Sequence, residues 1–290
     1  MSIFTTVEAV PNRMRDIFDF VRNQKNPINK EDLRSLFMPP SKRKNESSSL
    51  FDGALKECLN IGLFVDDGGI QTSDFVKNSQ DHDFRDLIGD LLFHNDHQNL
   101  EKHKKVLVSV AWLMTRTPGN PLNFSNTITT QLTSSLGENA SMTEISGSIT
   151  RLHNLYYWCW FLGFGEIFGG TKNREAVKLF MPNPAAILER KLVEIFKNSD
   201  VLRIDEFVRN LGSLIPVLDG GVIRNELESV LLDQSMVDEG NVSETLSYAI
   251  KQLALRKLIS LEKRSDARGL ILNYGNAMRS ESVSEVRINS

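Results

Sequence analysis

The sequence contains only two cysteines, Cys58 and Cys159, among its 290 residues. Two scattered cysteines in apolar helical runs form no disulfide framework, which suits a reducing cytosol. Proline is also scarce, and no low-complexity tract is present, which argues against wholesale disorder. The longest apolar run, residues 155–165, is about half of what a membrane-spanning helix needs, and the amino-terminal segment does not resemble a signal peptide. We therefore expect a soluble, cytoplasmic protein with no membrane partner.

The chain also lacks an excess of positive charge, since 34 lysines and arginines face 37 aspartates and glutamates. A general polyanion-coating role is excluded, and any binding of nucleic acid must come from local basic patches. No GxxxxGK[ST] phosphate loop is present, and no serine triad can be assigned. His94, His97 and His103 lie close together, but their spacing matches no metal site, and a polar interdomain helix accounts for them better. We expect a non-enzymatic protein with no metal, no cofactor and no small-molecule substrate.

What the sequence does contain is one order of elements that recurs along the chain. In the first copy, residues 11–24 predict a helix, residues 30–37 a second helix capped by Asn29, and residues 48–61 a third. After Gly62 the period changes, and LFVDDGGIQTS predicts two short strands around an Asp-Asp-Gly-Gly turn. Helix, helix, helix and hairpin in this order are typical of a winged helix.

The end of the chain follows the same order. Residues 185–198 predict an amphipathic first helix, residues 202–207 lead into a second, and residues 242–257 predict a third. An acidic insertion, roughly residues 220–240, separates the second helix from the third. Residues 258–273, LISLEKRSDARGLILN, predict two strands around a basic turn that contains glycine.

The middle of the chain contains a further copy. Residues 104–116, 123–136 and 143–161 predict three helices, and residues 163–168 and 176–181 predict two strands. The predicted third helices of all copies align without gaps, and internal repetition of this kind outweighs any single motif. The sequence therefore predicts a mainly α-helical, α+β chain of three tandem winged helix-turn-helix domains. The predicted parts are a first domain (1–78), a connecting helix or linker (79–103), a second domain (104–184), a third domain with the acidic insertion (185–275) and a polar carboxyl-terminal tail (276–290).

The candidate contacts to nucleic acid follow from this fold. In a helix-turn-helix protein the third helix enters the major groove, and its positive amino-terminal end favours phosphate. Basic and hydroxyl side chains lie before and at the start of the third helix in the first copy, and on the third helix and wing of the last copy. Lysine and arginine would neutralise phosphates, and serine could bond to phosphate or base. The alternative is solvated loops with a serine as helix cap. The predicted nucleic-acid-binding residues are Lys42, Arg43, Lys44, Ser48, Ser49, Lys251, Arg256, Lys263, Arg264 and Arg268.

Two features favour a protein partner instead. The acidic segment 219–239 would repel DNA if it lay near the groove. The stretch 156–164 carries more aromatic side chains than one side of a small helix can bury. A place in the core explains these aromatic residues, and the alternative is an interface for another protein or a second copy.

The first copy reads PNRMRDIFDFVRNQKNPINKEDLRSLFMPP and then SSSLFDGALKECLNIGLF. This layout and the length of the chain resemble DpdG, a component of bacterial clusters that insert 7-deazaguanine derivatives into DNA and restrict unmodified DNA. The resemblance implies a phage-defence role beside helicases and nucleases, and it supplies no catalytic residue. A second resemblance is to tandem winged-helix accessory subunits of bacterial condensin-like machines, which generally carry two copies.

From the repeats and the resemblance we expect a non-enzymatic DNA-binding component of a bacterial defence or DNA-modification and restriction system. Its expected partners are DNA and other proteins of the same system. The alternatives are a protein–protein scaffold subunit of a DNA-processing complex and a transcriptional regulator.

Overall fold

The computed structural model describes residues 8–38, 50–79, 82–94, 96–125, 127–172, 175–232, 240–265, 267–275 and 278–289. Its internal contacts divide the chain into two compact units. Unit 1 consists of residues 1–94 and 150–162, and unit 2 of residues 95–149 and 163–290. Within the described residues, no helix is both long enough and apolar enough to cross a membrane.

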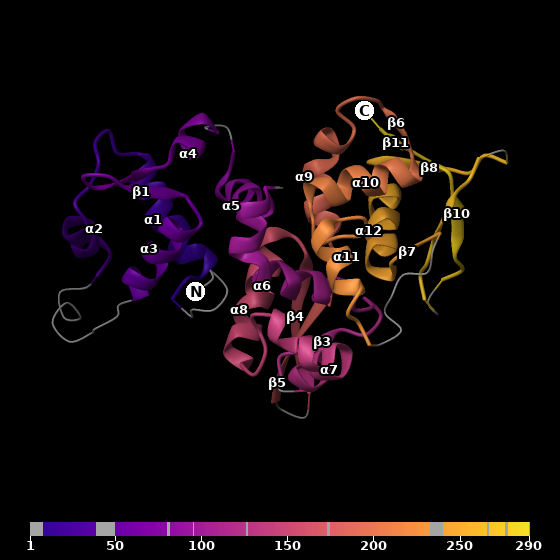
Figure 1. Ribbon diagram of the computed structural model, residues 1–290, viewed down its shortest axis with the longest axis horizontal. Helices are drawn as coiled ribbons and strands as arrows, with labels where there is room; N and C mark the ends of the chain where they lie inside the picture. The colour runs from indigo at the N-terminus through magenta and orange to yellow at the C-terminus, as the bar shows by residue number, and fades with distance from the viewer. Residues whose placement is uncertain are drawn as a thin grey trace. The chain divides into compact units, whose positions relative to one another are not determined.

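Unit 1 contains the first copy of the repeated order (Figure 1). Its first helix begins at Pro11, a position where the missing N–H of proline breaks no helical hydrogen bond. Asn29 caps the second helix by accepting a hydrogen bond from the backbone of Glu31 at 2.8 Å. The elements of unit 1 are α1 (Pro11–Arg22), α2 (Lys30–Phe37), α3 (Leu50–Asn60), β1 (Phe64–Asp66), β2 (Ile70–Thr72), α4 (Asp74–Asn78), α5 (Phe84–Phe93) and most of α8 (Ile149–Leu162).

The core of unit 1 forms around the fully buried ring of Phe18 on α1. The ring lies 6.3 Å from that of Phe64 and 5.2 Å from that of Phe84, measured between centroids. Phe84 in turn contacts Phe161 on α8 at 5.8 Å. These aromatic contacts join α1, β1, α5 and α8 into one hydrophobic core.

The small sheet of unit 1 includes a third segment beside β1 and β2. Ile28 and Ile70 exchange two backbone hydrogen bonds of 3.0 and 2.8 Å, so β2 lies between Ile28 and β1. Gly69 adopts a φ of +142°, and a Cβ there would lie 3.1 Å from the carbonyl oxygen of Ile28. A glycine is therefore required where the hairpin approaches Ile28.

Unit 2 contains the remaining helices and strands. The helices are α6 (His97–Met114), α7 (Thr127–Leu136), the 3-10 helix η2 (Gly137–Met142), α9 (Ala185–Ile195), α10 (Ile204–Leu214), α11 (Val222–Glu228) and α12 (Glu244–Leu255). The strands are β3 (Leu122–Asn123), β4 (Gly165–Lys172), β5 (Glu175–Pro182), β6 (Val201–Arg203), β7 (Asn241–Val242), β8 (Ile259–Glu262), β9 (Leu270–Leu272), β10 (Glu281–Val283) and β11 (Glu285–Ile288).

The strands in the described part of unit 2 form three small sheets. One has the order β3-β5-β4, and a second, β6-β11-β8, packs beside α10 and α12 (Figure 1). Both are antiparallel throughout. The third sheet, β10-β9-β7, contains one parallel pair, between β7 and β9. The α+β class predicted from the sequence is confirmed.

All three copies share a more detailed order than the sequence showed. In each, a helix, a strand, two helices and two strands follow one another, with further elements inserted in two of the copies. The second copy has η2 between α7 and α8, and the third has α11 and β7 before α12 and β9 and β10 between β8 and β11. The last strand of each copy lies in the middle of its sheet, between the other two. In the first copy the bridge residue Ile28 takes the place of the first strand. The sequence prediction missed this strand in every copy, because two or three extended residues leave no readable period.

The predicted pairing of the strands in residues 258–273 is wrong. β8 pairs with β11, and β9 pairs with β10 and β7, so β8 and β9 form no hairpin. The stretch 278–289, expected as a polar tail, instead supplies β10 and β11. Val283 and Val286 are 3% and 0% exposed, so β10 and β11 each bury a valine in the core.

Two further elements differ from the sequence prediction. The acidic insertion contains α11, whose Leu227 is fully buried and which packs against α6. α6 begins at His97 rather than near Lys104, because Asp96 caps it by accepting a hydrogen bond from the backbone of Asn99 at 3.3 Å.

Candidate nucleic-acid interface

The predicted contacts of the first copy, Lys42, Arg43, Lys44, Ser48 and Ser49, lie outside the described residues. Those of the last copy lie in unit 2 and fall into two groups. Lys251 is on α12 and Arg256 follows its last residue, whereas Lys263, Arg264 and Arg268 lie between β8 and β9.

Both predicted residues at α12 are engaged by carboxylates of the same unit. The Nζ of Lys251 donates to both carboxylate oxygens of Glu281, at 2.8 and 3.1 Å. The guanidinium of Arg256 donates two hydrogen bonds, of 2.6 and 2.8 Å, to the carboxylate of Glu189 on α9. These cations therefore tie α12 to neighbouring elements.

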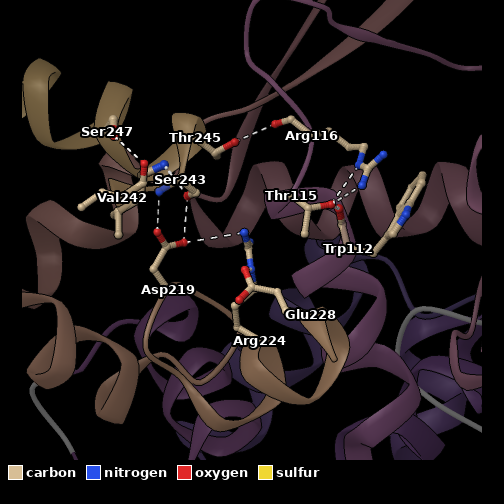
Figure 2. Close-up of polar contacts among 11 residues, drawn as sticks. Trp112, Thr115, Arg116, Asp219, Arg224, Glu228, Val242, Ser243, Thr245 and Ser247 are labelled. Atoms are coloured by element: carbon tan, nitrogen blue, oxygen red, sulfur yellow. Dashed lines mark hydrogen bonds and ion pairs between the residues drawn. The ribbon is translucent and has the colours of Figure 1, made fainter. Parts of the chain in front are cut away.

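The amino-terminal end of α12 is capped from within the protein (Figure 2). Ser243 is its N-cap, and the Ser243 Oγ accepts a hydrogen bond from the backbone of Leu246 at 3.3 Å. The carboxylate of Asp219 accepts from the Ser243 backbone N–H at 2.7 Å and from the Ser243 Oγ–H at 2.8 Å. A buried carboxylate therefore occupies the position where the helix would favour a phosphate.

Further contacts cover the first turns of α12. Thr245 donates its hydroxyl hydrogen to the carbonyl oxygen of Arg116 at 2.6 Å, and the Thr117 hydroxyl bonds to the carboxylate of Glu244. The fully buried Ser247 donates to the Val242 carbonyl at 3.3 Å. The first turns of α12 are thus held inside unit 2.

Arg224 on α11 is fully buried beside this cap. Its Nε donates to the carboxylate of Glu228 at 2.6 Å, and its Nη2 lies 3.8 Å from a carboxylate oxygen of Asp219. Figure 2 shows Asp219 between Arg224 and Ser243. Nη1 and Nη2 have no hydrogen-bond partner among the described residues. The arginine therefore depends on two carboxylates for charge compensation, and losing either would be costly. We call Asp219, Arg224, Glu228 and Ser243 the α12 lock.

A tight glycine corner places Asp219 in the lock. A Cβ on Gly212 of α10 would lie 2.4 Å from the carbonyl carbon of Gly220, and one on Gly221 would lie 2.4 Å from the carbonyl oxygen of Pro216. Backbone therefore packs directly on backbone where α10 meets the turn before α11, and larger residues do not fit.

The three cations between β8 and β9 lie on the surface. Lys263, Arg264 and Arg268 are all exposed. Arg264 pairs with Glu285 at 2.9 Å, and its backbone N–H donates to the Ser284 Oγ at 2.7 Å. At the other end of the loop, a Cβ on Gly269 would lie 2.6 Å from the carbonyl oxygen of Val283, so the chain is closely held there. The chain is thus held at Arg264 and at Gly269, and the side chains of Lys263, Arg264 and Arg268 reach the surface.

The acidic segment presents less free charge than the sequence indicated. Asp219 and Glu228 belong to the α12 lock, and Glu226 accepts from the Nζ of Lys104 on α6 at 2.8 Å. Hydrogen bonds to Glu226 and Glu101 raise the pKa of Lys104. Asp233, Asp238 and Glu239 lie outside the described residues.

The aromatic-rich stretch lies mostly in the core, as predicted. Tyr156, Trp158, Phe161 and Phe164 are buried, and the Nε1–H of Trp158 donates to the carbonyl oxygen of Ala9 at 2.9 Å. Trp160, however, is 55% exposed.

Sequence reasoning missed the α12 lock. A serine directly before an apolar periodic run is an N-cap signal, and Ser243 carried it. Asp219 and Arg224 gave no comparable signal, because their roles depend on contacts across the fold.

One of three comparisons with known proteins found a match. No match was found among curated proteins, and none among solved structures. The model of the DpdG-like family matches residues 1–267, which include the first two copies and the third as far as the loop 263–269. This match covers most of the sequence, and the chain therefore belongs to the DpdG-like family.

Proposed function

We propose that the chain is a non-enzymatic, DNA-binding component of a bacterial system that modifies DNA with 7-deazaguanine derivatives and restricts unmodified DNA. Membership of the DpdG-like family supports the role in this system. The proposed partners are DNA and other proteins of the system. Three tandem winged-helix domains would supply the contacts.

The observation that carries the binding proposal is the repeated order of elements. Helix, strand, helix, helix, strand, strand, with the last strand central, is the order of a winged helix. An order similar to it recurs along the chain, with Ile28 in place of a strand in the first copy and further elements inserted in the other two, and this recurrence supports the proposal. Winged helices belong to the helix-turn-helix motifs that dock on duplex DNA. The exposed cations of the loop 263–269 correspond to the wing of the last copy.

The test is a mobility-shift titration of the full chain on duplex DNA across salt concentrations. Each phosphate that the protein neutralises should steepen the log–log plot of affinity against salt by about 0.9. We expect a clearly salt-dependent shift with more than one such contact. A shift that is absent, or independent of salt, would remove the proposal.

A second candidate function is a scaffold that uses the same domains to hold other proteins. Two observations favour it: the engagement of Lys251 and Arg256 by carboxylates, and the exposed indole of Trp160. Co-purification with proteins of the same system, unaffected by nuclease treatment, would support the scaffold. A monodisperse monomer that binds DNA would count against it.

A further inference from the structure

We propose that unit 2 contacts DNA through the loop 263–269 and not through α12, so that it follows the phosphate backbone without reading bases. This inference rests on the proposed DNA-binding function and specifies the surface that serves it. It departs from the usual arrangement, in which the third helix of the motif reads base edges in the major groove.

The first argument is that α12 offers little open surface, because six of its twelve residues are buried and five are half-buried. All residues of α12 are described, and among them only Leu255, the last, is exposed, at 74%. A helix that enters the major groove needs an open side along its first turns. In α12 those turns carry Thr245, Leu246 and Ser247, which are 2%, 1% and 0% exposed.

The second argument is that the elements around α12 hold it by polar contacts on several sides. The α12 lock closes its amino-terminal end (Figure 2). Along the helix, Tyr248 donates its hydroxyl hydrogen to the carbonyl oxygen of Tyr274 at 3.0 Å, and Lys251 pairs with Glu281. If α12 moved out of unit 2 to enter the major groove of DNA, several buried polar groups would lose their hydrogen-bond partners, which is unfavourable.

The third argument is the position and charge of the loop. Lys263 and Arg264 follow directly after β8, which is an edge strand of its sheet. Lys263, Arg264 and Arg268 outnumber the one acidic residue of the loop, Asp266. Arg264 pairs with Glu285, whose side chain is 13% exposed, but the Arg264 side chain itself is 55% exposed, so its guanidinium can meet a phosphate while it stays paired.

The chemistry of these side chains favours phosphate over bases. Arginine binds phosphate oxygens through two parallel N–H groups, and lysine does so as a point charge. Contacts to phosphate fix position but carry no sequence information. We therefore infer sequence-independent binding to the DNA backbone at this surface.

The test compares two triple variants of the full chain. The loop variant carries Lys263→Gln, Arg264→Gln and Arg268→Gln. The matched control carries Lys191→Gln, Lys197→Gln and Arg209→Gln, which removes the same charge from the region of α9 and α10. Both are titrated against several unrelated duplexes at a series of salt concentrations. The single variant Lys263→Gln serves if the loop variant folds poorly.

Three lost phosphate contacts should weaken binding about a hundredfold at 0.15 M salt and lower the salt slope by about 2.7. The single variant should weaken binding about fivefold, with a change of slope of about 0.9. The factor should be the same on every duplex, and the control should bind like the parent.

The outcomes separate this inference from the proposed function. A parent that binds DNA together with a loop variant that binds equally well would overturn the inference and leave the function in place. A loss that differs between duplexes would show base reading and would also overturn it. A parent without salt-dependent binding would remove both.

Discussion

The α12 lock makes a direct prediction about the stability of unit 2. In the variant Asp219→Asn, one acceptor oxygen becomes an N–H₂ donor, and the negative charge beside Arg224 is lost. The carboxamide can then accept only one of the two hydrogen bonds that Ser243 donates, of 2.7 and 2.8 Å. Its N–H₂ group faces the other donor of Ser243. Arg224 retains only Glu228, at 2.6 Å, as a partner for its buried charge.

The expected cost follows from these contacts. A hydrogen bond to a charged group contributes about 1.5–3 kcal/mol. Breaking a buried ion pair costs about 3–5 kcal/mol, but the pair between Arg224 and Asp219 is long, at 3.8 Å, and Glu228 remains. We therefore expect a loss of about 3 kcal/mol in the free energy of unfolding of unit 2. For a unit of this size, the melting temperature should fall by about 6–12 °C.

A chain with two units requires a separate probe for each, because a single two-state transition does not describe it. Amide hydrogen exchange in α12 reports on unit 2 and should accelerate about a hundredfold in Asp219→Asn. Cys58 and Cys159 report on unit 1, in which both are fully buried. Burial raises the pKa of both thiols, so their labelling by a thiol reagent depends on the opening of unit 1. The rate of thiol labelling should therefore be the same in Asp219→Asn as in the parent.

The matched control is Asp205→Asn, which removes a half-exposed carboxylate of the same unit that pairs with Arg203 at 3.1 Å and Arg209 at 3.7 Å. Such surface pairs contribute about 0–1 kcal/mol, so this variant should behave like the parent. If Asp219→Asn exchanges its α12 amides no faster than Asp205→Asn does, the lock does not hold α12 and the reasoning fails.

Three further predictions concern single groups. Burial, together with the charge of Lys102, lowers the pKa of His103 from 6.5 to about 4, so the unfolded chain takes up a proton first as the pH falls. Unit 2 should thus lose up to about 3 kcal/mol between pH 6.5 and 4, and denaturation of His103→Gln across this range should show a much smaller loss. Partial burial raises the pKa of Glu281, but hydrogen bonds from Lys251 and Tyr274 outweigh it and lower the pKa below 4.5. The ion pair between Glu281 on β10 and Lys251 on α12 is then fully present above pH 4.5 and is lost as the pH falls through the folded pKa of Glu281. Exchange of β10 amides should accelerate there in the parent but be independent of this titration in Glu281→Gln. Trp158→Phe leaves the buried carbonyl of Ala9 without its donor, at a cost of about 1–3 kcal/mol, and should accelerate thiol labelling in unit 1 while α12 exchange stays unchanged.

Much of the local structure could be predicted from the sequence. The apolar period of α1, the cap at Asn29 and the turn at Gly68 and Gly69 are all encoded within a few residues, and the structure contains each of them. The exposed cations at Lys263, Arg264 and Arg268 could also be identified, because charged residues beside a glycine in a short turn rarely become buried.

The pairing of strands could not be obtained in the same way. β8 finds its partner β11 beyond the loop 263–269 and two intervening strands, and nothing in either short segment specifies the other. Main-chain hydrogen bonds are the same for every residue, so the choice of partner depends on which side chains the whole fold buries.

The part played by each charged residue was likewise decided only by tertiary structure. Lys251 and Arg256 are of the residue types that contact DNA, but in the fold each pairs with a carboxylate. These carboxylates are 30 and 67 residues away in the sequence. The same holds for Asp219, which the sequence places in an acidic segment and the fold places against Ser243, 24 residues further on. Electrostatic attraction acts over a few ångströms in space, whatever the separation along the chain, and only the packing of unit 2 brings these groups within that distance.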